Sequence, residues 1–452
     1  MVVVGAGVSG LYTAWKCADF IKASEIAIVN RETSIGGRLL SYKNKFGHTL
    51  ELGAMRIPSS HENTINLCRS LRIPLIQFNA DIQTSPLHLS NPENVNKQSC
   101  IHQNASTFVG YAIARYCGFP FFEPKFKKDI VKLMLKKLSS NGIDINKLSL
   151  ENWVSILFSQ DEASYLWSLL GYRHLANRDL SFISCFTKDM INEEDFYYKP
   201  LNGMQEIATS LHKKFMHFGG QCYSGHSVLS ISRQNEIYSL TTSGRLRLET
   251  EKLVLAIPPS SILKINNIKS ILDQNTIASL LSIGSYASRK TYYTFTNILD
   301  LKKLNGRDGF FRTNLNLGIG HWDPCKSNIS SNKQSKAILA SYNNSDQNED
   351  LNSKDYKLAY LKELSFCLNH KLNKPSDVVE INWKSFQSSV SAHYWKVGVD
   401  IKVTLKNLEN SSPHIFFVGE AFNDQHGWIA SGLSSSDRVI AQLKKFKWII
   451  YD

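Results

Sequence analysis

The chain has 452 residues, of which 42% are hydrophobic and 20% charged, as in ordinary globular proteins, and it is long enough for two or three domain-sized units. Its apolar runs are all shorter than the ~20 residues that span a bilayer. Met1 leads into a glycine loop without the features of a signal peptide. The eight cysteines and thirteen histidines show no C-x-x-C pair and no metal-ligand spacing. We therefore expect a cytoplasmic protein that has no transmembrane segment and binds no metal.

The formal net charge of +13 would suit a nucleic-acid binder, but the lysines are spread along the chain and no nucleic-acid motif accompanies them. We expect no nucleic-acid partner. The densest basic stretch, Lys125 to Lys137, mixes lysines with apolar residues at helical spacing. A solvated helix face is the favoured interpretation, and a membrane-surface or acidic-partner role is the alternative.

The first forty residues predict a βαβ unit with a phosphate-binding loop. Residues 2–4 form the expected strand, 11–23 the helix and 26–29 the next strand, and Gly5-Ala-Gly7-Val-Ser-Gly10 follows the first strand. Glycines with this spacing allow a tight turn, close approach to a pyrophosphate and close helix–strand packing, while the helix N-terminus offers backbone N–H groups. We interpret the loop as a dinucleotide site formed by Gly5, Gly7 and Gly10.

At the end of the second strand, where an acid is expected to bind the ribose hydroxyls, the sequence has Asn30. An amide can hydrogen-bond a hydroxyl, but it lacks the charge assistance that strengthens such a bond. From the sequence alone, Asn30→Asp should therefore keep or tighten cofactor binding. Glu32, two residues further on, is an alternative ribose ligand.

Beyond this unit, residues 60 to about 190 look mostly helical, with amphipathic segments at 62–71, 125–139, 147–158 and 161–172. Strand patterns return at 227–232, 237–242 and 252–257, continue through 285–395, for example at 291–295, and end at 415–418. The sequence contains no internal repeat. This order of elements predicts an α/β protein (α+β overall).

Several short motifs resemble those of the flavin-containing amine oxidase superfamily, in its L-amino-acid oxidase form. They are Ile35-Gly36-Gly37-Arg38, Glu51-Leu52-Gly53-Ala54-Met55-Arg56-Ile57-Pro58, Leu201-Asn-Gly203-Met204, Ala256-Ile-Pro258-Pro259, Gly419-Glu420 and Gly427-Trp428-Ile-Ala-Ser-Gly432. Their order and spacing follow the family along most of the chain. Tyr394-Trp395…Gly398 and His426-Gly427-Trp428 look most like the tryptophan-oxidising members, whereas Arg173, His174 and Asn344 depart from them, which leaves the substrate side chain open.

The resemblance implies a Rossmann-type FAD-binding domain, a mixed-sheet substrate domain and a helical domain. The FAD-binding segments would be 1–75, 196–270 and 401–452, the helical substrate-access domain 76–195 and the substrate-binding sheet domain 271–400. It also implies FAD contacts at Gly37, Arg38, Gly53, Ala54, Met55, Arg56, Val228, Glu420 and Trp428. No cysteine lies in 419–432, where some members attach the flavin, so we expect non-covalent FAD.

The same resemblance assigns residues to the substrate. The Arg56 position binds the α-carboxylate, for which a guanidinium offers a planar two-donor fork. Tyr342 matches a tyrosine that shares the carboxylate, Gly427 supplies a carbonyl that accepts from the amine, and Trp428 supplies an aromatic wall. Tyr172 would line the side-chain pocket. Ordinary packing is the alternative interpretation for all three aromatic residues.

Lys290 aligns with the family's lysine near flavin N5, where a cation could favour oxygen reduction or relay a proton. Its neighbour Arg289 is the rival, because alternate strand residues point to opposite faces and only one of the two can face the flavin.

We expect oxidation of an L-amino acid, with dioxygen as co-substrate. The alternatives are an amino-acid monooxygenase, an amine or polyamine oxidase and a flavin-binding protein without turnover. The oligomeric state is open, with a homodimer among the options.

Overall fold

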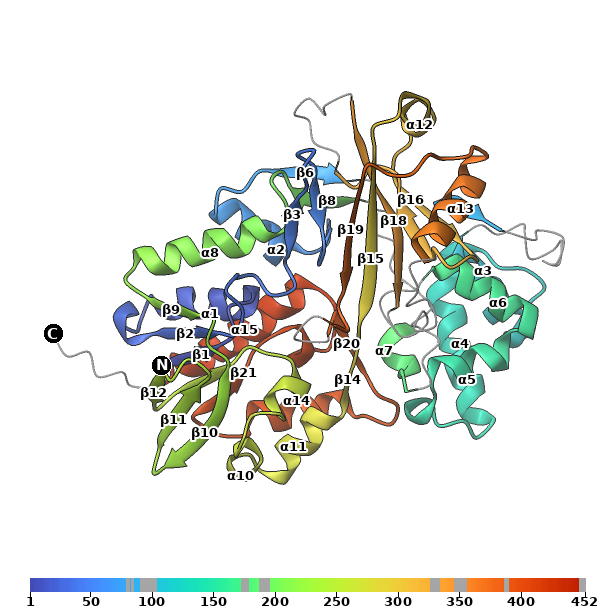
Figure 1. Cartoon of the computed structure of the whole chain (residues 1–452). Coiled ribbons are helices and arrows are strands. Elements are labelled where there is room, and N and C mark those ends of the chain that lie inside the picture. The colour runs from blue at the N-terminus through green and yellow to red at the C-terminus, as the bar shows by residue number, and fades with distance from the viewer. Residues whose placement is uncertain are drawn as a thin grey trace.

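The computed structural model describes residues 1–78, 82, 85–89, 104–171, 179–186, 196–325, 334–344, 356–385 and 390–446. Three regions lie side by side in Figure 1: a parallel sheet with its helices, a long mixed sheet in the middle, and a group of helices on the far side. The predicted fold class is confirmed by this architecture.

The parallel sheet has the strand order β21-β13-β1-β2-β9, and every neighbouring pair is parallel. Its strands are β1 (Val2–Val4), β2 (Ala27–Asn30), β9 (Gln221–Ser224), β13 (Leu253–Leu255) and β21 (Ile415–Phe417). Alternate residues of β1 enter two different cores: Val3 packs with helices α1 (Val8–Cys17), α8 (Gln205–His217) and α15 (Ile429–Leu443), and Val2 and Val4 pack on the other face. Burial on both faces explains why these strands read as continuous apolar runs.

Helix α1 differs from its predicted range of 11–23. It begins at Val8, directly after the glycine loop, and ends at Cys17. Beyond it, the N–H groups of Phe20 and Ile21 both bond to the Cys17 carbonyl, which closes the last turn. The chain reverses here because β2 must return beside β1 in parallel register, and the apolar Phe20 and Ile21 pack in this turn rather than on a longer helix.

The mixed sheet has the order β19-β15-β18-β17-β16-β7, in which only the β16–β7 pair is parallel. Its strands are β7 (Leu87–His88), β15 (Ser288–Phe295), β16 (Phe310–Thr313), β17 (Ile319–His321), β18 (Lys336–Asn344) and β19 (Asp377–Asn382). All of β15 is buried, so both of its faces are covered. Lys290 lies opposite Tyr342 of β18 in the register.

The helical group contains α3 (Ala105–Cys117), α4 (Lys127–Ser140), α5 (Leu150–Leu157), α6 (Gln160–Leu170) and α7 (Phe182–Phe186). The predicted helices at 125–139, 147–158 and 161–172 correspond to α4, α5 and α6. Ser149 and Ser159 cap α5 and α6, and Ser159 forms a capping box with Glu162, which explains where these helices begin. None of the predicted amphipathic segments covers α3.

Two smaller sheets have three strands each: one contains β10 (Val228–Gln234), β11 (Ile237–Thr242) and β12 (Arg247–Thr250), and the other contains β5 (Ile57–Pro58), β8 (Tyr197–Pro200) and β6 (Leu75–Phe78). Two further sheets have two strands each: β3 (Ser41–Lys43) pairs with β4 (Thr49–Glu51), and β14 (Ile283–Tyr286) pairs with β20 (Ala392–Trp395). The remaining helices include α2 (Glu62–Ser70), α9 (Pro259–Ile262), α10 (Ile268–Ile271), α11 (Gln274–Leu281), α12 (Ile298–Leu304), α13 (Tyr356–Leu368) and α14 (Ile401–Glu409). The expected domain boundaries stay a proposal.

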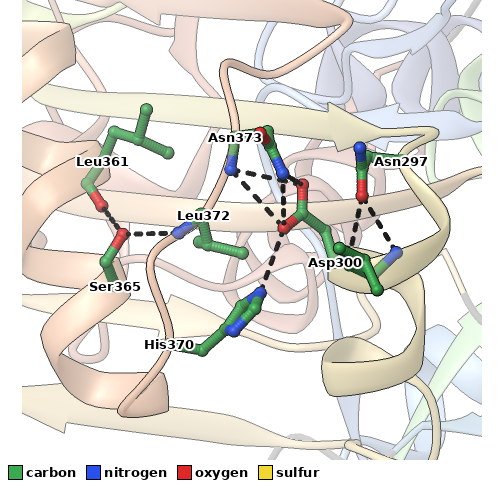
Figure 2. A network of polar contacts seen from close by, with 8 residues as sticks. Asn297, Asp300, Leu361, Ser365, His370, Leu372 and Asn373 are labelled. Carbon is green, nitrogen blue, oxygen red and sulfur yellow. Dashed lines mark hydrogen bonds and ion pairs between the residues drawn. The ribbon is translucent and has the colours of Figure 1, made fainter.

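A buried carboxylate joins α12 to the turn after α13 (Figure 2). Asp300, which is fully buried, accepts hydrogen bonds from the backbone and side-chain nitrogens of Asn373 at 3.3–3.4 Å and lies 3.3 Å from Nε2 of His370. Asn297 caps the same helix through the N–H groups of residues 299 and 300. These contacts fix one end of the mixed sheet, remote in sequence from the glycine loop.

Replacement of Asp300 by Asn should destabilise the protein by ~1–3 kcal/mol, because the new amide group would face the Asn373 donors and leave buried polar atoms without partners. Thermal unfolding measures this effect. Asp129→Asn is the matched control, since this exposed carboxylate makes only a 3.9 Å surface ion pair with Lys132. Equal melting temperatures for the two variants would show that the Asp300 network contributes nothing.

Candidate cofactor and substrate site

One long cavity joins the parallel sheet to the mixed sheet. The residues that line it come from the glycine loop, the ends of β2 and β13, strands β10 and β15, and the segments 36–39, 53–54 and 419–432. Among the predicted site residues it is lined by Gly5, Gly7, Asn30, Gly37, Arg38, Gly53, Ala54, Val228, Lys290, Tyr342, Glu420, Gly427 and Trp428. The cavity therefore collects residues from all the motifs at both ends of the chain.

The glycine loop has the shape that a pyrophosphate requires. Gly7 precedes the first turn of α1, and a Cβ built on it would meet no atom within 4 Å, so the cavity reaches the backbone there. Gly10 lies on the inner side, where a Cβ would come 2.1 Å from the Gly5 carbonyl oxygen. The first N–H groups of α1 have no side-chain cap and face an anion favourably. These residues fit a dinucleotide cofactor.

Asn30 ends β2 beside this loop, and its amide group bridges two parts of the backbone. Its Oδ1 accepts from the N–H of Ala6 at 3.2 Å, while Nδ2 donates to the carbonyls of Glu32 at 2.7 Å and Ser34 at 2.8 Å. Two carbonyl acceptors and one N–H donor fix the orientation of the amide. Asn30 thus holds the glycine loop against the segment that leads to Gly36, and Glu32 also lines the cavity.

Glu420 is a buried acid in the lining of the cavity. Arg38 and His393 both hydrogen-bond to its Oε1, and the backbone N–H of Gly427 donates to its Oε2 at 2.7 Å. Burial alone would raise the pKa of Glu420, but electrostatic interaction with the adjacent His393 and Arg38 side chains holds that pKa well below its usual value. The carboxylate therefore stays ionised and joins three separated segments.

Lys290 is a buried cation in the lining of the same cavity. Its ammonium group donates to the backbone carbonyls of Glu51, at 3.0 Å, and Gly53. Burial lowers the pKa of Lys290 to about 7, although the nearby Glu51 carboxylate raises it. Glu51 in turn accepts from the N–H of Met204 at 2.9 Å, which explains the Leu201–Met204 turn motif.

Arg289, the neighbour of Lys290, lies outside the cavity lining, and its guanidinium is 5.3 Å from the ring of Tyr356. Lys290 and Arg289 therefore occupy different environments, as strand alternation requires. The Lys290 ammonium lies 5.1 Å from the ring of Tyr342 on the neighbouring strand. This arrangement brings a cation and a tyrosine to the cavity end of the mixed sheet.

Arg56 lies behind Trp428 in an aromatic enclosure. The guanidinium carbon is 4.8 Å from the ring of Tyr197, 5.6 Å from that of Phe310 and 5.9 Å from that of Trp428. Aromatic faces attract a guanidinium through the negative charge of their ring faces. His61 packs edge-on against Trp428 at 5.0 Å and supports this wall.

The structure does not bring every predicted residue to the cavity surface. Gly10, Met55 and Arg56 lie outside the lining, and Tyr172 lies outside the described residues. The sequence motifs did not predict Trp383, whose Nε1 donates to the Leu52 carbonyl at 2.9 Å, or the lining residues Tyr286, Ser288, Ser391 and Ala392. Only Ser288 carried a usable signal, because it is two residues from Lys290 on the same strand face.

In the described part of the chain, no helix is both long and apolar enough to cross a membrane. Across the same residues, no group of three or more His, Cys, Asp or Glu side chains could hold a metal ion.

The parallel sheet, the glycine loop and the long cavity define a dinucleotide-binding protein. The chain belongs to the family of flavin containing amine oxidoreductases, whose sequence model matches residues 8–440. This match confirms the predicted family and its flavin cofactor.

Relatives named L-amino-acid oxidase match parts or most of the chain, and a solved structure shares its fold. An L-amino-acid oxidase from Daboia russelii is 22% identical over 96% of this chain and 87% of its own length. An L-amino-acid oxidase from Mus musculus is 44% identical over 17% of the chain, but the match spans only 12% of that enzyme's own length. The match to the L-amino-acid oxidase from Trimeresurus stejnegeri spans 46% of that enzyme's own length. A redesigned putrescine oxidase has a similar fold, with a TM-score of 0.72 and 13% identity over 98% of both chains.

The bonds of Asn30 reverse the expectation for Asn30→Asp. A carboxylate would place an oxygen against the carbonyls of Glu32 and Ser34, so we expect the variant to weaken FAD binding by ~1–3 kcal/mol. Titration of the apoprotein with FAD, followed by flavin fluorescence, measures this. Asn235→Asp, in an exposed turn, is the control. FAD affinity equal to wild type in Asn30→Asp would mean that the amide bridge does not shape the loop.

Proposed function

We propose that the chain is an FAD-dependent oxidase that converts an L-amino acid to its imino acid and reduces dioxygen to hydrogen peroxide. The observation that carries this proposal is the placement of Arg56 beside Trp428, at the end of the segment whose Gly53 and Ala54 line the cavity. A guanidinium is the side chain best suited to a carboxylate. The names of the curated relatives support the same substrate class.

The glycine loop, Arg38 and Glu420 would hold FAD, which would supply a hydride acceptor for the substrate Cα and a route for the electrons to dioxygen. The chain's own residues then have the task of orientation. Arg56, with Tyr342, binds the α-carboxylate. The carbonyl of Gly427, a residue held by Glu420 in a left-handed conformation (φ 84°), accepts from the substrate amine. Trp428 covers the pocket between them.

Lys290 supplies a proton-bearing group beside the cavity. Because its pKa lies near 7, it exchanges a proton readily at physiological pH. Its bonds to two carbonyl oxygens orient the ammonium, and its burial keeps the local dielectric low. We assign it to the oxygen half of the reaction, whereas Arg56 acts in the amino-acid half.

The residues named here would serve an amino-acid monooxygenase equally well, and only the product, a 2-oxo acid or an amide, separates the two activities. An amine or polyamine oxidase is less well supported, because its substrate has no carboxylate for Arg56. Non-covalent attachment of FAD rests on the lack of cysteine in 419–432. A cytoplasmic location and a homodimer stay proposals.

Arg56→Ala should lose ~2–5 kcal/mol of substrate binding or transition-state stabilisation, because it removes a partly desolvated charged fork. Arg56→Lys should recover little, since a point charge cannot reproduce two parallel bonds. FAD content should stay the same. Stopped-flow measurement of anaerobic flavin reduction by an L-amino acid tests this.

Arg233→Ala is the control, because that guanidinium also lies over a ring, 5.7 Å from Tyr238, but belongs to the small sheet of β10–β12. The flavin of the Arg233→Ala protein should be reduced at the wild-type rate. If the L-amino acid reduced the flavin of the Arg56→Ala protein at the wild-type rate and with the wild-type affinity, the amino-acid assignment would be refuted.

Lys290→Met should leave anaerobic reduction largely intact and slow reoxidation by dioxygen. The ammonium form predominates below its pKa of about 7, so the wild-type reoxidation rate should fall as pH rises through about 7. The Met variant should show no such fall. Arg289→Met removes the neighbouring cation, which lies outside the cavity, so this variant should keep the fall in reoxidation rate with rising pH. A pH dependence that survives in Lys290→Met would assign it to another group.

A further inference from the structure

Three phenylalanines within eight residues are exposed at one edge of the helical group. The exposed fractions are 46% for Phe119, 63% for Phe121 and 47% for Phe126. Tyr111 and Leu133, on the adjoining helices α3 and α4, are 37% and 45% exposed. Single exposed apolar side chains are normal, whereas several close together mark a binding surface. We call residues 119–126 the phenylalanine loop.

The phenylalanine loop is anchored to the helices beneath it. Phe122 is buried, with its ring edge-on to Tyr111 at 5.6 Å. It packs so closely on α3 that a Cβ at Gly110 would lie 2.3 Å from the ring. Because Phe122 takes the inward position, its neighbour Phe121 is turned out. The exposed rings are therefore presented by a fixed backbone.

Lysines follow these rings along the chain, and the ammonium of Lys125 lies 4.9 Å from the ring of Phe126. Between residues 119 and 137 there are six lysines and two acids, Glu123 and Asp129. On α4, Lys128, Lys132 and Lys136 are exposed and recur every four residues, which places them on one helix face. The long lysine stems can cover apolar surface while the ammonium groups stay in water. Charge and apolar area thus occur together.

We propose that the phenylalanine loop and the lysine face of α4 bind the surface of an anionic lipid bilayer. Aromatic rings that enter the interfacial layer beside lysines that meet lipid headgroups are the arrangement of peripheral membrane attachment. A second copy of the chain is a poorer partner, because it would bring the same positive patch and a net charge of +13. The glycine loop lies on the far side of the mixed sheet (Figure 1), so attachment leaves the cofactor end clear.

Co-sedimentation of the full FAD-loaded chain with vesicles tests this proposal. We expect binding to phosphatidylcholine vesicles that contain phosphatidylserine, little binding to phosphatidylcholine alone, and weaker binding at high salt. Combined Phe119→Ser and Phe121→Ser should weaken binding by about tenfold or more. Combined Lys128→Gln and Lys132→Gln should weaken it by about fivefold per lysine.

The controls are Phe366→Ser, a ring 53% exposed on α13, and combined Lys302→Gln and Lys303→Gln on α12. These should bind like wild type, and all variants should keep their flavin content and melting temperature. Failure of wild type to bind anionic vesicles would overturn the proposal. So would phenylalanine-loop variants that bind normally, or a concentration-dependent dimer that only those variants lose.

Discussion

The ionised carboxylate of Glu420 lies where three distant segments of the chain meet. It is 7% exposed, and such a buried charge is tolerated only when it is paired and hydrogen-bonded. Arg38, His393 and the Gly427 N–H meet that requirement together. Because each belongs to a different part of the sequence, the acid fixes the turn after β2, strand β20 and the 420–428 loop relative to one another.

The same loop connects the two ends of the site. Gly427 is bonded to Glu420, and Trp428, the next residue, lies over Arg56, the proposed carboxylate ligand. The other walls around Arg56, Tyr197 and Phe310, come from a small sheet and from the mixed sheet. A shift of the 420–428 loop would therefore change the cofactor cavity and the proposed carboxylate site together. This coupling gives a physical reason for the family's closing motif.

Local sequence patterns predicted the elements that depend mainly on neighbouring residues or on regular alternation along one strand. The strand–loop–helix start follows from glycine geometry and from Val2–Val4, and alternation along β15 predicted that Lys290 and Arg289 would differ in surroundings. The extent of α1 was predicted too long, because apolar residues at 20 and 21 pack in a turn.

Features that depend on tertiary contacts escaped prediction. Trp383 and Ser391 reach the cavity only through strand pairing across the fold. The bridging bonds of Asn30 depend on how the segment 32–36 folds back, which no local pattern encodes. Arg56 was singled out by resemblance, but its three aromatic neighbours come from residues up to 372 positions away.

Anaerobic titration of the purified, FAD-loaded protein tests the proposed activity most directly. The titrants are the L-amino acids, their D-enantiomers and a diamine such as putrescine, and the readout is loss of flavin absorbance. The account predicts that at least one L-amino acid bleaches the flavin, while its D-enantiomer and the diamine do not. Bleaching by the diamine alone, or by no amino acid at all, would contradict it.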